Sequence, residues 1–274
     1  MNKAEALVRW WRRRPIPRPA STGTGPPLVA FQCNLCGAAN RVPETALGRE
    51  LPSCVGCGST VRWRALVHLV CQALLGREVV IPDSPRSRDL TGIGLSDDAC
   101  VARALAACFD YTNTYFHADP RLDIAAIPDE LAGHYDFLTA SDVFEHVVPP
   151  VGIAFRNARR LLKPGGVLVF TVPFSLAADT LEHFPSLHDF EVREERGGWV
   201  LHNRTADGRE ERFGDLVFHG GPGTTLEMRL FSRAALERHF AAAGFADVRF
   251  AADPCPRFGI VWPEPWSIPV VATA

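Results

Sequence analysis

The chain of 274 residues has no long apolar run and no excess of charge of either sign. A membrane-spanning helix needs about 20 consecutive apolar residues, and no run approaches that length, so we expect no membrane span. Basic and acidic residues number 29 and 31, and the net charge of −2 gives no general attraction to nucleic acid, although a local basic patch is compatible with it. The content of 47% apolar and 22% charged residues is typical of a soluble globular protein, large enough for one α/β core and a small accessory module.

The amino-terminal segment lacks the apolar core that a signal peptide needs. Residues 1–19 are strongly basic, but no apolar core follows the charge, so we expect a cytoplasmic protein. Trp10 and Trp11 lie among five arginines. Two interpretations stay open for residues 1–27: a flexible basic tail, or a weak anchor to an anionic surface, because aromatic and basic side chains gather at lipid headgroups.

Four of the eight cysteines form two C-x-x-C-G pairs. Seventeen residues separate the first pair, Cys33 and Cys36, from the second, Cys54 and Cys57. The spacing predicts a structural Zn²⁺ site of four thiolates, which leaves no open position for water. Disulfides or free thiols are the alternative, and a cytoplasmic location disfavours disulfides. The other four, which we expect to be ordinary buried side chains, are Cys71, Cys100, Cys108 and Cys255.

Residues 135–174 carry the most informative pattern. An apolar run at 137–140 ends at a polar cluster, a helix-like segment and a Lys-Pro-Gly-Gly turn follow, and a second apolar run occupies 167–172. Strand, helix and strand in this order predict parallel strands joined by a right-handed crossover. Such sheets bind ligands beyond the carboxyl ends of their strands, which is where the polar cluster lies. The cluster consists of Ser141, Asp142, Glu145 and His146.

This stretch, with its Glu-His pair and its LLKPGG turn, resembles the second half of class I S-adenosylmethionine (SAM)-dependent methyltransferases. The junction CGSTVRWR at 57–64 is similar to that of bacterial methyltransferases in which a zinc ribbon directly precedes the catalytic domain. The resemblance covers most of residues 31–250. It implies an α/β fold: a Rossmann-like class I methyltransferase sheet, mostly parallel with an antiparallel last strand, behind a small zinc ribbon. The boundaries that we expect are 28–60 for the ribbon, 61–85 for a connecting helix and linker, 86–252 for the methyltransferase domain with a substrate insertion at 174–229, and 253–274 for a C-terminal strand and tail.

The resemblance places the SAM site first on the segment that follows the linker. There a strand is expected to end in Gly92-x-Gly94-x-Ser96, where missing side chains let the cofactor approach the backbone; a plain loop is the alternative. The family normally ends its second strand with an acidic residue that binds the ribose. This chain departs from that pattern, because Asp119 comes only after the expected strand at 111–116. The ribose contact is therefore assigned to Asp119 or is missing.

Further cofactor contacts follow from the same resemblance. Asp123 and Ile124 match the third-strand pair that contacts adenine, unless Asp123 is a solvated loop acid. Ser141 and Asp142 are expected beside the methionine end of SAM. His146 is expected to face the same site if the segment after Asp142 is helical, although in related enzymes the Glu-His pair more often holds the turn by hydrogen bonds.

The insertion offers the candidate catalytic residues. Methyl transfer to oxygen or nitrogen needs an in-line approach and a proton acceptor, and histidine is the natural base near neutral pH. His183 and His219 are the candidates, with Glu182 and Glu227 as orienting carboxylates; the alternative is that both histidines are loop hydrogen-bonders. A hairpin is predicted at 199–205 with its turn at 206–208, and a final antiparallel strand at 259–262.

Three hypotheses about function stay open. The first is a SAM-dependent methyltransferase that acts on a small or glycan-type acceptor, at a hydroxyl; the glycan part depends on resemblance to enzymes of surface-polysaccharide pathways. The second is an RNA methyltransferase whose ribbon grips nucleic acid, which the near-neutral charge makes less favoured. The third is a methyltransferase-like scaffold without turnover. The sequence indicates no oligomeric state.

Overall fold

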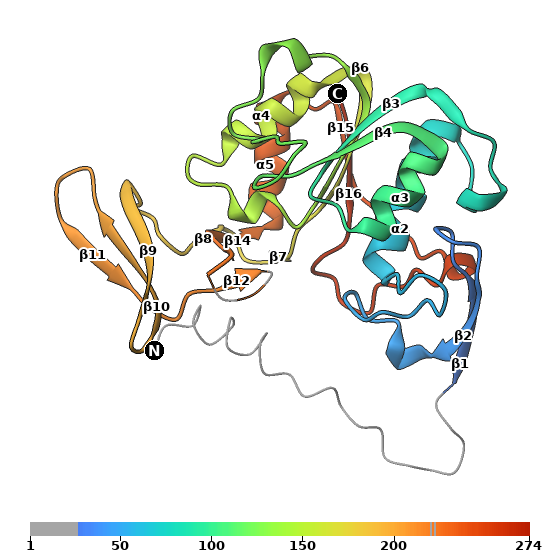
Figure 1. Cartoon of the computed structure of the whole chain (residues 1–274), viewed down its shortest axis with the longest axis horizontal. Helices are drawn as coiled ribbons and strands as arrows, with labels where there is room; N and C mark the ends of the chain where they lie inside the picture. Colours follow the sequence, from blue (N-terminus) through green and yellow to red (C-terminus); the bar gives the residue numbers. More distant parts are fainter. Residues whose placement is uncertain (1–26, 220, 222) are drawn as a thin grey trace.

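The computed structural model describes residues 27–219, 221 and 223–274 (Figure 1). Residues 1–26, expected to form a flexible basic tail or a weak surface anchor, lie outside the described residues; Pro27 of that segment is described. In the described part of the chain, the central sheet has six strands in the order β15-β16-β6-β5-β3-β4. The four strands that run parallel are β3 (Ser87–Leu95), β4 (Phe109–Thr114), β5 (Tyr135–Ser141) and β6 (Leu162–Thr171). β16 (Val270–Thr273) runs antiparallel between β6 and β15 (Asp247–Phe250). The predicted mostly parallel sheet with an antiparallel strand is confirmed.

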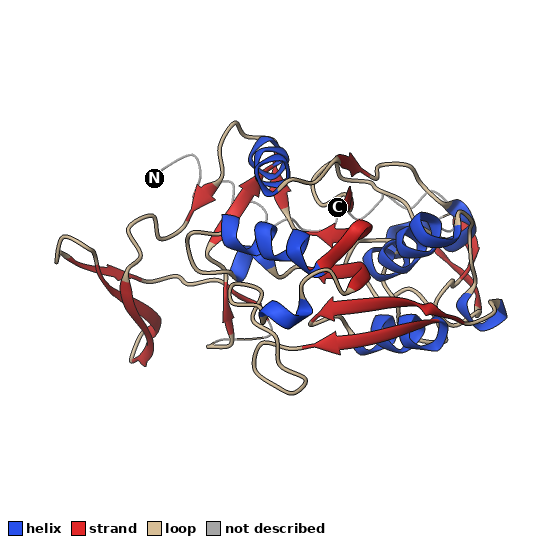
Figure 2. Ribbon diagram, turned by 90° about the horizontal axis from the view of Figure 1, so that it is seen from above, coloured by secondary structure: helices blue, strands red, loops and turns tan. Residues whose placement is uncertain are grey.

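Helices cover both faces of this sheet, which explains why its strands are nearly continuous apolar runs. In β6, Leu168 and Phe170 belong to one buried cluster, whereas Val167 and Val169 belong to another, as the alternation of a strand requires. The first cluster lies under α4 (Gly152–Leu161) and α5 (Arg233–Ala243), and the second under α2 (Val61–Leu75) and α3 (Ala99–Cys108) (Figures 1 and 2). No described helix is both long and apolar enough to cross a membrane.

The helix ends follow the sequence closely. Thr60 caps α2 by accepting from the N–H of Trp63, and Gly76 ends the helix with a left-handed backbone. Ser232 and Gly244 do the same for α5. The N-cap of α3 is Asp98, whose side chain accepts from the N–H of Cys100.

Two predicted strands are wrong. Ile260 forms only an isolated bridge with Cys255, and the antiparallel strand is β16, eleven residues later than predicted. β16 is buried in the sheet, and its Val270 is 1% exposed, so the end of the chain does not lie on the surface as a tail. The segment of the predicted third strand at 122–124 has no strand; only a bridge between Tyr115 and Arg121 precedes it. The sheet therefore lacks that edge strand within the described residues.

The ribbon packs against α2 and the C-terminal segment. It consists of the hairpin β1 (Leu28–Gln32) and β2 (Ala39–Pro43), then η1 (Glu44–Ala46) and the second cysteine turn. Phe31 and Leu47 share a buried cluster with Val61 of α2 and with Phe258 and Ile260. Short 3₁₀ turns mark other connections: η2 (Ile81–Asp83), η3 (Asp129–Leu131), η4 (Phe144–His146) and η5 (Pro256–Phe258).

The insertion forms two small sheets and a two-stranded pair. β10 (Gly198–Arg204) lies between β9 (Asp189–Glu195) and β11 (Glu210–Phe213), and this sheet projects from the body (Figures 1 and 2). The predicted hairpin is confirmed as β10 and β11. The second sheet joins β7 (Phe174–Ser175), β14 (Arg229–Ser232) and β8 (Leu181–Glu182), and the pair is β12 (Phe218–His219) with β13 (Thr225–Leu226).

Candidate functional site

The carboxyl ends of three neighbouring parallel strands form one edge of the central sheet. Leu95, the last residue of β3, is in register with Thr114 at the end of β4 and with Ala140 near the end of β5. Parallel sheets bind their ligands beyond such an edge. Ser96 and Asp142, which follow β3 and β5, both have a left-handed backbone with φ of 56°. The chain therefore turns away from the sheet at both positions and presents polar groups there.

The two glycines of the predicted cofactor turn have a packing role. A Cβ on Gly92 would lie 2.0 Å from Cζ of Phe137, and a Cβ on Gly94 would lie 1.8 Å from the hydroxyl oxygen of Tyr111. The missing side chains thus make room for two aromatic rings inside the sheet layer that α2 and α3 cover. Contact of these glycines with a cofactor stays a prediction, and Ser96, exposed just after β3, is the part of the turn that reaches the edge.

Asp97, directly after Ser96, is a buried carboxyl group that the sequence analysis did not single out. It is 4% exposed and accepts hydrogen bonds from the hydroxyls of Tyr111, at 2.6 Å, and Thr139, at 2.5 Å. Its N–H donates to Asn113 Oδ1 at 3.0 Å. Burial raises the pKa of Asp97. The carboxylate therefore ties the turn after β3 to β4 and β5.

The residues expected to contact ribose and adenine differ in their surroundings. Asp119 is exposed in the loop after β4. Asp123 is half-buried, and its Oδ1 accepts from the N–H of Ala125 at 2.8 Å. Ile124 is 5% exposed and packs in the main core, where its carbonyl accepts from Asn157 at 2.9 Å. This burial does not support the predicted contact of Ile124 with an adenine ring.

Two arginines reach the end of β5. Arg49 lies between the two cysteine turns of the ribbon, and Arg62 lies in the first turn of α2. Arg49 forms a bidentate ion pair with Asp142, with Nη2–Oδ1 at 2.6 Å and Nη1–Oδ2 at 2.9 Å. Arg62 donates to the hydroxyl of Ser141 and, through Nε and Nη2, to both carboxylate oxygens of Glu50. Burial raises the pKa of Asp142, but Arg49 and Arg62 outweigh it and hold the pKa well below its usual range. No motif in the sequence indicates that Arg49 belongs to this edge.

Glu227 lies between the two candidate bases. Its Oε1 is 2.9 Å from Nε2 of His183, and its Oε2 is 3.3 Å from Nε2 of His219. Burial raises the pKa of Glu227, but hydrogen bonds from the two histidines outweigh it and lower the pKa to about 2. The carboxylate is therefore ionised at neutral pH and orients both rings. The other candidate carboxylate, Glu182, instead pairs with the buried Arg229, with Oε1 2.8 Å from Nε.

A second contact joins His219 to His146. Nδ1 of His219 lies 2.8 Å from Nε2 of His146, whose Nδ1 is 2.9 Å from the carbonyl oxygen of Leu226. Burial lowers the pKa of His146, so the ring is neutral at pH 7. Both ring nitrogens of His219 thus have protein partners, whereas among the described residues His183 has a side-chain hydrogen bond at Nε2 only, to Glu227. The segment that carries His146 is the 3₁₀ turn η4, not the α-helix that the sequence suggested.

Glu145, the partner of His146 in the Glu-His pair, is buried beside these histidines. Its side chain is 2% exposed, and neither carboxylate oxygen has a hydrogen-bond partner among the described residues. Burial raises the pKa of Glu145 well above its usual value. Its main-chain carbonyl accepts from the N–H of Met228 at 2.9 Å. Within the described part of the chain, the Glu145 side chain therefore forms no hydrogen bond that holds the turn. This differs from the role that the Glu-His pair more often has in related enzymes.

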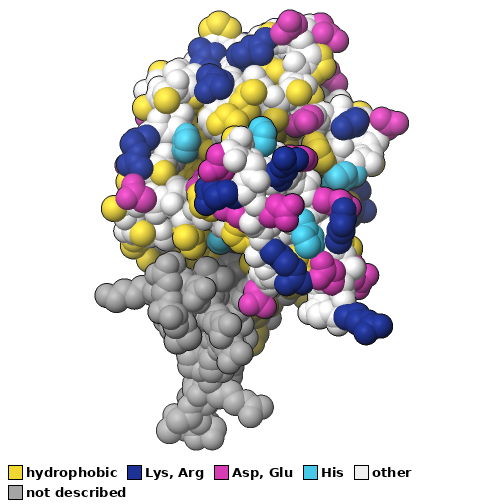
Figure 3. Space-filling model, turned by 90° about the vertical axis from the view of Figure 1, so that its left-hand side faces the viewer, with side chains coloured by type: hydrophobic (Ala, Val, Ile, Leu, Met, Phe, Trp, Pro, Cys, Tyr) yellow, Lys and Arg dark blue, Asp and Glu magenta, His cyan; other side chains and the backbone are white. Residues whose placement is uncertain are grey.

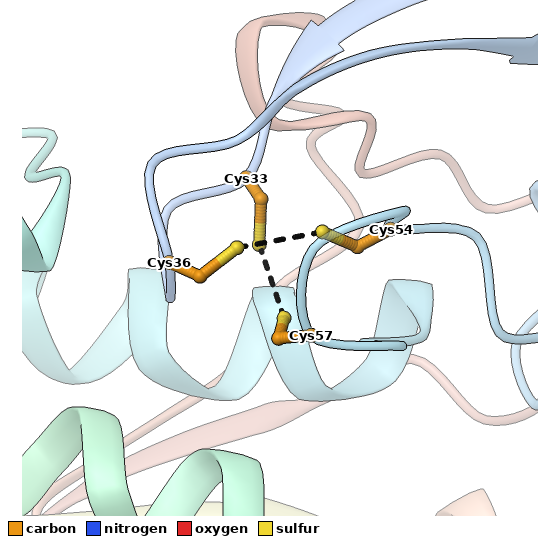
Figure 4. Close-up of side chains that lie close together, drawn as sticks. All are labelled: Cys33, Cys36, Cys54 and Cys57. Carbon is orange, nitrogen blue, oxygen red and sulfur yellow. Dashed lines mark hydrogen bonds between the residues drawn. The ribbon is translucent and has the colours of Figure 1, made fainter.

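The four paired cysteines converge on one point (Figure 4). Sγ of Cys33 is 3.7 Å from that of Cys57, and Sγ of Cys36 is 3.5 Å from that of Cys54. These separations are too long for a disulfide bond of about 2.05 Å. They are close to the edge, about 3.8 Å, of a tetrahedron with Zn–S bonds of about 2.3 Å. The geometry fits the donor set of a four-thiolate zinc centre and does not fit disulfides.

Arg64 gives this cysteine centre a buried positive neighbour. Its side chain is fully buried and donates to the carbonyl oxygens of Phe258, at 2.7 Å, Gly259, at 3.1 Å, and Ser59, at 2.8 Å. These acceptors are neutral. Desolvation lowers the pKa of Arg64, and the nearby cysteines oppose that effect. Because a buried charge needs a counter-charge, an ion with four thiolates, of net charge −2, suits these surroundings.

Several solved structures with low sequence identity to this chain are methyltransferases. A Burkholderia thailandensis 1,6-didemethyltoxoflavin N1-methyltransferase, solved with 1,6-didemethyltoxoflavin and S-adenosylhomocysteine, is 16% identical over 77% of this chain and 77% of its own, with a TM-score of 0.41. A SAM-dependent methyltransferase from Mesorhizobium loti is 16% identical over 80% of this chain and 100% of its own, with a TM-score of 0.39. The CurJ carbon methyltransferase is 14% identical over 79% of this chain and 55% of its own, with a TM-score of 0.47. Curated proteins gave no match.

The family comparison decides the identity. A family model described as a methyltransferase domain matches residues 70–249, which is more than half of the chain. The matched region begins in α2, ends in β15 and includes the carboxyl edge of β3, β4 and β5. The chain therefore belongs to the methyltransferase-domain family, and it is a SAM-dependent methyltransferase.

Proposed function

We propose that the enzyme transfers the methyl group of SAM to a hydroxyl of a small or glycan-type acceptor, with His183 as the general base. The contact between His183 and Glu227 is the observation that supports this most. Nε2 of His183 donates to the ionised carboxylate at 2.9 Å, so the lone pair of the neutral ring lies on Nδ1. A histidine oriented by a carboxylate in this way is a typical general base.

In the proposed reaction, His183 removes the proton from the acceptor hydroxyl. SAM, when bound, supplies a methyl group on a positively charged sulfur. With SAM bound, Nδ1 of His183 would take the hydroxyl proton as the acceptor oxygen bonded to the methyl carbon and the carbon–sulfur bond broke. The products would be a methyl ether, S-adenosylhomocysteine and an imidazolium, which the ionised Glu227 would stabilise. His219 is less suited to this role, because both of its ring nitrogens are engaged within the protein.

The carboxyl edge of β3, β4 and β5 is our proposed site for SAM. Its side chains fit a polar, zwitterionic ligand, since exposed and half-buried hydroxyls and carboxylates lie there together with two guanidinium groups. Arginine recognises carboxylates well, so the arginines suit the methionine carboxylate. The residues that we assign to SAM are Ser96, Asp123, Ser141, Asp142, Arg49 and Arg62.

We propose a structural role for zinc at the cysteine centre. The ion would hold the two cysteine turns together, and with them the intervening segment that carries Arg49 to Asp142. Four thiolates leave no position for a substrate. A centre of this kind also suits the cytoplasm, where thiols stay reduced, and we propose that location.

The insertion supports a small or glycan-type acceptor over RNA. Basic, acidic and histidine side chains are interspersed on the face shown in Figure 3. Examples on the β9–β11 sheet are the pairs of Arg193 with Glu191 and of Arg212 with Glu195. A surface of mixed sign suits sugar hydroxyls better than a phosphate backbone, which calls for a basic excess.

Methyl transfer from radiolabelled SAM tests the proposal. Purified enzyme is incubated separately with nucleotide sugars, small glycans and total RNA, and label in RNA alone would refute the proposed acceptor class. His183→Ala is expected to lower kcat by about 10² to 10⁴ fold, the usual contribution of a general base. The matched control is His202→Ala, because His202 on β10 also pairs with a glutamate but its side chain is 39% exposed. A His183→Ala enzyme with unchanged kcat would remove that residue from the mechanism.

A further inference from the structure

We propose that Glu145, His146 and His219 form a second metal site, for a divalent transition cation such as Zn²⁺, separate from the cysteine centre. One atom from each residue lies within 4.8 Å of the other two. The three residues come from η4 and β12, segments separated by more than 70 residues of sequence, which the fold brings together beside the carboxyl edge of the sheet. This site does not depend on which acceptor the enzyme methylates.

The three atoms have the right spacing for one ion. Nε2 of His146 and Nδ1 of His219 are 2.8 Å apart, and Oε1 of Glu145 is 3.8 Å from each of them. A triangle with these sides has a point about 2.0 Å from all three corners, which is the length of Zn–N and Zn–O bonds. An ion therefore fits between them with little movement of the side chains.

The hydrogen bonds on the far sides of the rings direct both lone pairs at that point. The carbonyl of Leu226 accepts from Nδ1 of His146, which leaves Nε2 as the lone pair. The carboxylate of Glu227 accepts from Nε2 of His219, which leaves Nδ1 as the lone pair. Two lone pairs 2.8 Å apart repel each other unless a cation lies between them. Metal-binding histidines have the same arrangement, with the other nitrogen donating to a carbonyl or a carboxylate.

Glu145 supplies the negative charge of the site. Its carboxylate is almost fully buried and has no hydrogen-bond partner among the described residues, which is costly for a polar group. Coordination to a cation removes that cost. Two imidazoles and one carboxylate are a donor set of transition ions, and three protein ligands leave at least one position for water or for an oxygen of another molecule. The cysteine centre has no such position.

A proton is the alternative occupant of this cluster. A single proton shared by the two ring nitrogens would form an imidazolium next to the Glu145 carboxylate and would satisfy the same contacts. The number of ions bound by each variant distinguishes the two occupants. Zinc is the probe in this experiment, and the cysteine centre serves as an internal reference.

Equilibrium dialysis against Zn²⁺, followed by metal analysis of the full-length chain, tests the proposal. We expect two ions per wild-type chain, one ion in His146→Ala and in His219→Ala, and two ions in the control His202→Ala. Glu145→Gln, which keeps the shape of a buried side chain, is expected to weaken the second ion about 100-fold while the first is retained. With Co²⁺ as the probe, the cysteine centre gives intense sulfur-to-metal absorption, and the second ion gives only weak bands.

Two results would overturn the second site. One is a wild-type chain that binds a single ion and loses it in Cys54→Ser; the cluster then holds a proton. The other is a doubly substituted His146→Ala, His219→Ala chain that still binds two ions. Circular dichroism of each variant shows whether it is folded. If an alanine variant unfolds, Glu145→Gln and the cobalt spectrum of the wild-type chain decide between the two occupants.

Discussion

Arg49 and Asp142 form a bidentate ion pair although they are 93 positions apart in the sequence. Arg49 lies between the two cysteine turns, and Asp142 lies at the end of β5, in the region where parallel sheets bind their ligands. The side chains are 13% and 15% exposed, so the pair is largely shielded from water. Through this contact the ribbon forms part of the proposed cofactor site.

The first prediction concerns this ion pair. Arg49→Ala is expected to lower the free energy of unfolding by about 2 kcal/mol, less than for a fully buried pair because Arg62 stays near Asp142. Affinity for S-adenosylhomocysteine is expected to fall about tenfold or more, which corresponds to about 1.4 kcal/mol. Urea unfolding and calorimetric titration measure the two effects. Arg41→Ala, an exposed arginine of β2, is the control. Equal affinity of the wild type and Arg49→Ala for S-adenosylhomocysteine would show that Arg49 of the ribbon does not contribute to the cofactor site.

The second prediction concerns the zinc ion that we propose at the cysteine centre. A strong chelator is expected to lower the melting temperature by roughly 10 °C, because the buried Arg64 then loses its counter-charge and the ribbon loses its cross-link. Affinity for S-adenosylhomocysteine is expected to fall with it, since Arg49 is no longer held against Asp142. Cys54→Ser should reproduce both effects, whereas Cys255→Ser, whose thiol contacts Glu78 instead, should keep its zinc. A chelated protein with unchanged melting temperature contradicts the structural role.

Much of the fold could be predicted because it depends on local patterns. The parallel strands are continuous apolar runs, and helix ends such as Gly76 and Ser232 have local chemistry. β16 was missed because it is four residues long, follows a segment rich in proline and tryptophan, and pairs with β6 about one hundred residues earlier. Pairing over such a distance leaves no trace in the local sequence.

Some residues of the candidate site could also be predicted from the sequence, and others could not. Glu227 contacts both His183 and His219, as expected for an orienting carboxylate, although it is close in sequence only to His219 and follows His183 by 44 positions. Arg49 has no motif of its own, and its partner is known only once the ribbon is docked. Gly94 shows a different limit: glycine in a turn motif predicts a close approach, but the sequence does not say whether a ligand or a neighbouring ring makes it.

The third prediction concerns pH and Asp136, which joins β3 to β6 across β5. Partial burial raises the pKa of Asp136, but hydrogen bonds from Lys163 and from the N–H of Thr91 outweigh it and hold the pKa below its ordinary value of 3.8. A depressed pKa means that the charged form stabilises the fold above pH 3.8 and that this contribution is lost as pH falls through the folded pKa. Asp136→Asn is therefore expected to lower the free energy of unfolding by about 1 kcal/mol at pH 7 and by less at pH 3.

Urea unfolding at the two pH values measures this difference. Asp129→Asn is the control, since Asp129 pairs with Arg160 but its side chain is 93% exposed, and its substitution should change little at either pH. A cost for Asp136→Asn that is the same at both pH values would show that the hydrogen-bond geometry matters and the charge does not.

The fourth prediction separates the packing role of Gly94 from a cofactor role. Gly94→Ala is expected to lower the free energy of unfolding by about 3 kcal/mol, because the new Cβ would overlap the hydroxyl of Tyr111 and approach Asp97. Tyr111→Phe removes that hydroxyl and its bond to Asp97, at a cost of about 1 kcal/mol. If packing is the reason for the glycine, the double variant is more stable than Gly94→Ala alone, although the ring carbon 2.8 Å from the new Cβ prevents full rescue. A double variant less stable than either single variant would show that the two substitutions act independently. Lost affinity for S-adenosylhomocysteine in a fully folded Gly94→Ala chain would instead assign the glycine to the cofactor site.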